Sequence, residues 1–168
     1  MAVALFIKAE DLKRNTILDG NIDNDKFMNY IKIAQEIHIQ NYLGTDLYKR
    51  LQAGIIANDL TANEITLIND YIQDALIHFA GAEYLPFAAY TVGNGGIFKH
   101  ATDNSISVDK SEVDYLVQKE RDFAQYYTQR LVDYLCNNSN LYPEYSTNTD
   151  NEINPDRTVN YTGGWYLW

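Results

Sequence analysis

The sequence predicts a mainly α-helical fold, a small helical bundle around one long central helix. Apolar residues at helical spacing fill the stretch from Thr61 to Gly96, which is the longest such run in the chain. Shorter runs with the same spacing lie on both sides of it. The length of 168 residues is enough for one domain with a substantial core.

The central helix is expected to begin at Thr61, which forms a capping box with Glu64. Its apolar stripe consists of Ile65, Ile68, Ile72, Leu76 and Phe79. Residues 75–92 are apolar on nearly every side, so other helices should pack around this segment. Pro86 is expected to kink or break the helix, because proline lacks a backbone N–H. The glycine-rich run 93–96 should end whatever helix remains.

Four elements are expected before the central helix. Residues 1–8 form a short strand or an extended arm, and residues 9–15 form one or two helical turns. A helix over residues 25–43 carries a broad apolar face and ends at Gly44. A further helix runs from Thr45 to about residue 58. Because the linker between these two helices is so short, they should cross at a sharp angle.

Two short alternating runs around a turn cluster predict a small β-hairpin near residues 96–109. A closing helix follows from Ser111 to about Asn137. Its charged residues, Lys119, Arg121, Asp122 and Arg130, are expected to form a solvated face. The helical period ends there, so we divide the chain into a helical domain, residues 1–137, and an extended C-terminal arm, residues 138–168.

The arm is polar along its length and aromatic at its tip. It ends in Trp165, Tyr166, Leu167 and Trp168, and burying each side chain would contribute about 1.5–3 kcal/mol. A polar tether with an apolar tip is best explained by contact with another chain. The residues predicted to form interfaces are Ile97, Phe98, His100, Tyr142, Tyr145, Trp165, Tyr166, Leu167 and Trp168.

The formal net charge of −10 excludes some functions. No basic patch is present, and no Lys or Arg lies between Arg50 and Lys99. Binding of DNA or RNA by counterion release is therefore not expected. The 14 tyrosines suit interfaces, although a compositional habit of the source explains them equally well.

Few residues are candidates for catalysis or for binding a metal or a cofactor. Asp70, Asp74 and His78 have the spacing of one helical stripe and are conceivable metal ligands. No partner pair of ligands appears elsewhere, so a polar or intersubunit face is favoured. The run 93–96 lacks the Lys-Ser/Thr of a phosphate loop, and no nucleophile motif is present. We therefore predict no enzymatic activity, no metal and no cofactor. The apolar run 75–92 contains His78 and a proline, which favours a core helix over a membrane span.

The order of these elements resembles the head–tail connector proteins of tailed phages, also called adaptor or neck-ring proteins. Two motifs carry most of the resemblance. The first is the helix junction Asn41-Tyr42-Leu43-Gly44-Thr45-Asp46-Leu47-Tyr48, and the second is the end Gly163-Gly164-Trp165-Tyr166-Leu167-Trp168. The resemblance covers nearly the whole chain and is closest to versions from phages of Bacteroidetes, including crAss-like phages.

This resemblance implies a structural subunit of a closed ring, usually a dodecamer, that docks on the portal protein. Such a ring extends the DNA channel and offers a docking surface to further neck or tail proteins. It implies a place in the virion neck, and in the host cytoplasm during assembly. DNA passes through without sequence-specific binding, so an acidic wall would suit the channel. Glu64, Asp70 and Asp74 are the candidate channel-facing acids.

Two other hypotheses stay open. An acidic helical binding module, such as an inhibitor that mimics DNA, would form a tight complex with a basic enzyme and no ring. An enzyme that uses the stripe of Asp70, Asp74 and His78 would bind a metal ion.

Overall fold

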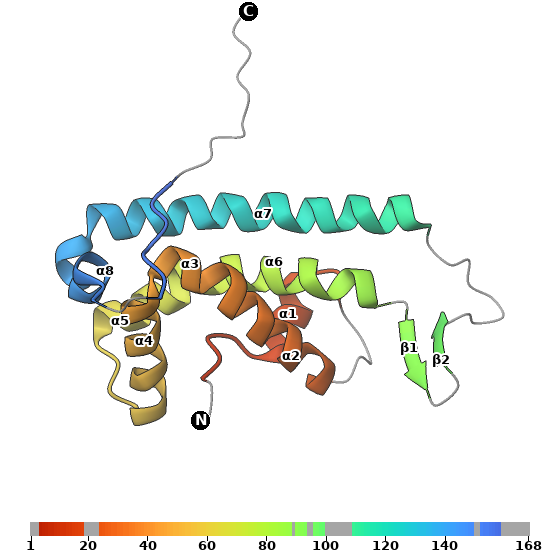
Figure 1. The fold of residues 1–168 in the computed structure, drawn as a ribbon, viewed down its shortest axis with the longest axis horizontal. Coiled ribbons are helices and arrows are strands. Elements are labelled where there is room, and N and C mark those ends of the chain that lie inside the picture. The colour runs from red at the N-terminus through yellow and green to blue at the C-terminus, as the bar shows by residue number, and fades with distance from the viewer. Residues whose placement is uncertain are drawn as a thin grey trace, which may run out of the picture.

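The structure is a computed structural model, and it describes residues 4–18, 24–88, 90–93, 96–99, 109–149 and 152–158. These residues are mainly helical, as predicted (Figure 1). The elements up to residue 57 are α1 (Ala9–Asn15), α2 (Asn24–Ala34), η1 (Gln35–Ile39), α3 (Gln40–Leu43) and α4 (Thr45–Ala57). Next come α5 (Ala62–Leu67), η2 (Ile68–Ile72), α6 (Gln73–Tyr84) and η3 (Leu85–Phe87). The remaining elements are β1 (Tyr90–Gly93), β2 (Gly96–Lys99), α7 (Lys110–Asn137), η4 (Ser139–Leu141) and α8 (Pro143–Thr147).

Helix α6 lies at the centre of the bundle. It packs against α7 on one side and against α1 and α2 on the other (Figure 1). Its residues are buried on several faces, including Ala75, Leu76, Ile77, Phe79 and Ala80. A Cβ at Gly81 would make an ordinary van der Waals contact with α7, at 3.4 Å from Glu120 Oε2. Helices therefore pack against this segment on two sides, as the sequence predicted that others would pack against it.

The bounds of this helix differ from the prediction. Thr61 caps its start as expected: its side chain accepts a hydrogen bond from Glu64 N at 3.3 Å, and its backbone N donates to Glu64 Oε2 at 2.7 Å. The π-helical turn η2 joins α5 to α6 without a break. The helix does not continue to residue 96, however, because a 3₁₀ turn at Pro86 ends it near Phe87. The longest helix is instead α7, with 28 residues.

The predicted hairpin near residues 96–109 is also corrected. β2 pairs antiparallel with β1, with Tyr90 opposite Lys99 and Gly93 opposite Gly96. The partner strand therefore lies before the glycine-rich turn, in a segment that we expected to be helical. Tyr90, Thr91 and Val92 are strong strand formers, and once Pro86 has ended the helix they favour a strand. The rest of the predicted hairpin, residues 100–108, lies outside the described residues.

Candidate functional site

Two of the predicted interface residues lie in the chain's own core. Tyr142 and Tyr145 are each 1% exposed. The Tyr142 hydroxyl donates to the carbonyl of Asn63 at 2.9 Å, and burial raises the pKa of this hydroxyl. The expectation that both tyrosines contact another chain is therefore wrong. Pro143 begins the short helix α8, which contacts α4 and η4 and so lies against the body.

Residues 152–158, which we call the C-terminal strap, lie across the corner between α3 and α4. The backbone N of Thr45 donates to the carbonyl of Ile153 at 3.0 Å, and Ile153 N donates to Thr45 Oγ1 at 3.1 Å. The backbone N of Asp156 donates to the carbonyl of Asn41 at 2.7 Å. The strap thus pairs with backbone groups at the end of one helix and the start of the next. The predicted extended arm is in this part attached to the body.

Gly44 makes the close approach of the strap possible. Its φ of +75° is a conformation that residues with a side chain rarely adopt. A Cβ at this position would lie 2.6 Å from Cγ of Pro155. The sequence indicated Gly44 as the end of a helix, but it gave no sign that Pro155, more than a hundred residues later, would cover it.

Arg157 fixes the far end of the strap to α8. Its guanidinium donates to the carbonyl of Tyr145 at 3.1 Å and lies 4.9 Å from the centre of that ring. Near the start of the strap, Asn148 accepts a hydrogen bond from Asp46 N at 3.1 Å and donates to the carbonyl of Ile153 at 3.0 Å. The helix junction at residues 41–48 is therefore the surface on which the chain's own C-terminal region lies.

The other predicted interface residues fall where side chains are not described. Ile97 and Phe98 belong to β2, of which only the backbone is described. His100 and the aromatic end, Trp165, Tyr166, Leu167 and Trp168, lie outside the described residues. Their role as contacts with another chain stays a prediction.

The three candidate channel-facing acids do not share one environment. Glu64 is buried and forms an ion pair with Arg50, with 2.9 Å between Arg50 Nε and Glu64 Oε1. Glu64 also completes the capping box of α5, so it stabilises the fold and is not available to a channel. Asp70 is exposed on η2, and Asp74 is half-buried at the start of α6. Only these two acids remain candidates.

His78 does not join Asp70 and Asp74 in a shared site. Its Nδ1 lies 2.7 Å from Oε2 of Glu120 on α7, and its ring stacks on Tyr127 with centroids 5.5 Å apart. The sequence did not single out Glu120, which is buried although it lies within a charged run. Among the described residues, no group of three His, Cys, Asp or Glu side chains is arranged to hold a metal ion. The histidine therefore ties α6 to α7.

The second histidine has the same role on the opposite side of α6. His38 Nε2 lies 3.0 Å from Glu83 Oε1, and the His38 ring stacks on Phe79 with centroids 4.1 Å apart. The half-buried His38 thus has a partner both for its ring nitrogen and for its ring face. Two histidine–glutamate pairs thus connect α6 to its neighbours.

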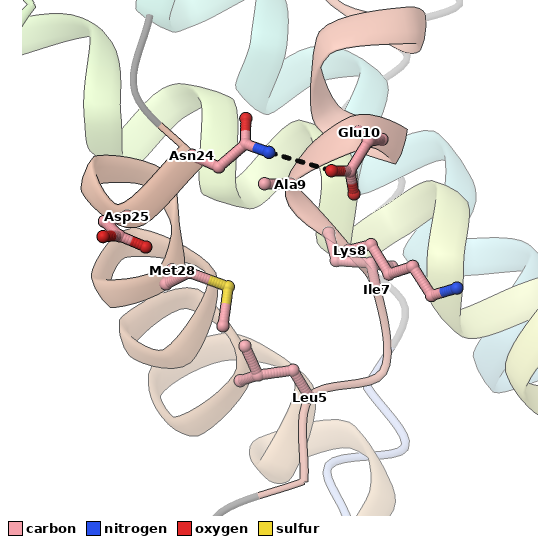
Figure 2. Close-up of a pocket in the computed structure, with 8 residues that line it drawn as sticks. All are labelled: Leu5, Ile7, Lys8, Ala9, Glu10, Asn24, Asp25 and Met28. Atoms are coloured by element: carbon pink, nitrogen blue, oxygen red, sulfur yellow. Dashed lines mark hydrogen bonds between the residues drawn. The ribbon is translucent and has the colours of Figure 1, made fainter.

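An open pocket of about 410 Å³ lies between the N-terminal segment and the start of α2 (Figure 2). Leu5 and Met28 lie at one end of it, and a hydrogen bond of 2.8 Å from Asn24 Nδ2 to Glu10 Oε1 lies at the other. The lining combines a few apolar side chains with acidic groups at its edge. It contains no arrangement typical of a catalytic site.

Comparison with known proteins identifies one family. A family of unknown function (DUF6712) matches residues 39–155. This region runs from the end of η1 into the C-terminal strap, and so includes the corner at Gly44 together with Pro155. No curated protein and no solved structure matches the chain significantly. No helix in the described part of the chain is both long and apolar enough to cross a membrane.

Proposed function

The chain belongs to this family of unknown function (DUF6712), and we propose that it is a structural virion protein that joins the phage head to the tail. Its copies form a ring, dodecameric in most of the connectors that it resembles, which docks on the portal protein and extends the DNA channel. Further neck or tail proteins bind the ring in turn. The function of the matched family is unknown, so the proposal rests on the resemblance of the sequence to head–tail connectors and on the observations below.

The observation that carries the proposal is the place where the described C-terminal strap ends. The backbone N of Asp156 donates a hydrogen bond to the carbonyl of Asn41 near the end of α3. This bond holds the strap at the corner of the body just before the last ten residues of the chain. Ten residues follow Thr158, and an extended chain of that length spans at most about 35 Å. This is enough for Trp165 and Trp168 to contact a neighbouring molecule.

A contact of this kind can close a ring. The fixed corner of one copy and a different surface on the next copy form a heterologous interface, which repeats until the ring is complete. The acidic composition fits the channel, since a wall that repels phosphates lets DNA slide. Asp70 and Asp74 are the residues that we assign to this wall.

The proposal is tested by assembling the full chain with its cognate portal protein. We expect co-elution in size-exclusion chromatography and a closed ring in electron micrographs. A chain that ends at Thr158, and the variant Trp165→Ala/Trp168→Ala, should lose the complex. Ile56→Ala is the matched control, because it removes an apolar side chain that is 63% exposed on α4 and should assemble normally.

Two results would contradict this function. In the first, the truncated chain assembles with the portal as well as the full chain does, so the aromatic end is not the contact. Alternatively, the protein forms a tight complex with a basic DNA-binding enzyme and never a ring. That outcome would favour the acidic inhibitor that mimics DNA.

A further inference from the structure

The pocket of Figure 2 lies between residues 5–10 and the start of α2 at residues 24–28, and we call it the N-terminal pocket. The wall formed by the N-terminal segment is held in place by two glutamines. Gln35 Nε2 donates to the carbonyl of Ala4 at 2.9 Å, and Gln35 Oε1 accepts from Phe6 N at 2.8 Å. Gln73 Nε2 donates to the carbonyl of Phe6 at 3.3 Å. Because this wall is tied to η1 and α6, the pocket is formed before any partner binds, which lowers the cost of binding.

The N-terminal pocket is apolar inside and polar at its edge. Ile7 and Ala9 line it and are buried, and Met28 lies on the α2 side with 45% of its surface exposed. At the other end Glu10 accepts one hydrogen bond from Asn24, and a carboxylate has further acceptor positions. Such a surface suits a side chain with an apolar body and one hydrogen-bond donor, which is the chemistry of tryptophan and tyrosine.

The size of the pocket agrees with such an occupant. Its volume of about 410 Å³ lies within the range of pockets that hold small molecules, about 300–1,000 Å³. An aromatic ring is therefore small enough to enter. Met28 is well placed to contact it, since methionine adapts its shape and its sulfur packs favourably against aromatic rings.

One segment of this chain has the composition that the pocket requires. Residues 159–168 contain no charged side chain, and they include Trp165, Tyr166 and Trp168. Two acidic copies with a net charge of −10 each repel one another. An uncharged aromatic segment is the part of one copy that approaches the other with the least repulsion.

The two ends of this contact lie on different sides of the body. In Figure 1 the described chain ends on the α7 side, whereas the N-terminal segment and the start of α2 lie on the other side of α6. An aromatic end on one side and a pocket on the other give a head-to-tail contact between copies. A contact of this kind repeats from copy to copy and closes a ring when the rotation allows it.

We propose that the N-terminal pocket of one copy binds residues 165–168 of a second copy. One indole ring packs against Ile7 and Met28, and its N–H donates to the carboxylate of Glu10. This inference depends on the proposed function for the ring, and it adds the surface that the aromatic end contacts, which is a neighbouring copy and not the portal.

The first test mixes two variants that each lack one half of the contact. Trp165→Ala/Trp168→Ala keeps the pocket, and Met28→Glu keeps the aromatic end but places a charge in the pocket. Analytical ultracentrifugation without portal, between about 1 μM and 1 mM, covers weak to moderate affinities. Each variant alone should be monomeric, whereas the mixture should form a one-to-one dimer, because the end of one chain enters the pocket of the other.

The matched control is Ile37→Glu, since Ile37 is 52% exposed on η1 and lies outside the pocket. This variant should self-associate like the parent chain, and Met28→Glu should raise the dissociation constant at least about tenfold, as buried aromatic anchors dominate many interfaces. A mixture without the dimer, or a Met28→Glu chain that associates like the control, would overturn the proposal.

The second test shows whose pocket is occupied and uses milder changes. In a Cys136→Ser background, the full chain with Met28→Cys/Leu167→Cys is oxidised. We expect a ladder of dimers and larger products in which position 28 of one copy is joined to position 167 of another. With Ile37→Cys in place of Met28→Cys this bond should be absent. A monomer closed within one chain, or a product without the 28–167 bond, would overturn the proposal.

The portal assay separates this inference from the proposed function. If Met28→Glu forms the ring on the portal as well as Ile37→Glu does, the pocket is not the contact and the proposed function stands. If the mixed dimer forms but no ring ever appears on the portal, the contact stands and the proposed function fails.

Discussion

Replacing Gly44 with alanine should detach the C-terminal strap. Gly44 has φ +75° and ψ 161°, which is a conformation that costs a residue with a side chain about 1–3 kcal/mol. The new Cβ would also lie 2.6 Å from Pro155 Cγ and 2.7 Å from its Cδ. Either the strap or the corner must move, because proline is rigid and cannot rotate away.

The expected magnitude follows from these two effects. If the strap moves, the three hydrogen bonds that join it to Asn41 and Thr45 are weakened, two of them between backbone groups and one to the Thr45 hydroxyl; each contributes about 0.5–1.5 kcal/mol. Together with the backbone strain, Gly44→Ala should lower the free energy of unfolding by about 3 kcal/mol. Urea denaturation measures this, and limited proteolysis should show earlier cleavage near residues 150–158.

A double-mutant cycle separates the two causes. Pro155→Ala removes the clash but not the backbone strain, so Gly44→Ala should cost less in that background than in the parent chain. The reasoning is refuted if Gly44→Ala changes stability by less than about 0.5 kcal/mol, or if its cost is the same with and without Pro155.

Three further predictions concern the core and the candidate channel. Burial and a hydrogen bond with Cys136 raise the pKa of Tyr145 to about 12 from 10.0, so the folded state keeps a proton that the unfolded state loses. The contribution of Tyr145 to the free energy of unfolding should be unchanged below about pH 10 and fall by about 2–3 kcal/mol towards pH 12; in alkaline unfolding the fall should be smaller by this amount in Tyr145→Phe, and the rest should remain because the pKa of Tyr142 is raised as well. Glu120→Ala should lower stability by about 1–3 kcal/mol by removing the partner of His78, and Glu120→Gln by less, because an amide can still bond to the ring; equal losses in urea denaturation would disprove the contact. Asp70→Lys/Asp74→Lys should assemble normally but slow DNA release from assembled particles, as its positive charges attract phosphates, and unchanged release kinetics would remove both residues from the channel wall.

Most helices of the body could be predicted from the sequence. Local signals set the helix starts and stops: the capping box at Thr61, the glycine at position 44 and the break at Pro86 are all found where they were predicted. Each depends on neighbouring residues only, so a single sequence is sufficient. The sequence placed Tyr90–Gly93 in the central helix, whereas the structure has it as strand β1. A short apolar run suits either a helix or a strand, and its length alone did not decide between them.

What the sequence could not show was long-range contact. Tyr142 and Tyr145 lie in a polar segment without helical period, and nothing local reveals that they fill the core. The same holds for Pro155 over Gly44 and for Glu120 beside His78, which are pairs that only the folded chain brings together.

The most direct test of the proposed role is a cryo-electron microscopy reconstruction of the full chain bound to its cognate portal protein. Our account predicts a closed ring of copies on the portal, with Trp165 and Trp168 of each copy buried against a neighbouring molecule. A portal with no ring, or a ring in which these side chains contact only their own chain, would contradict it.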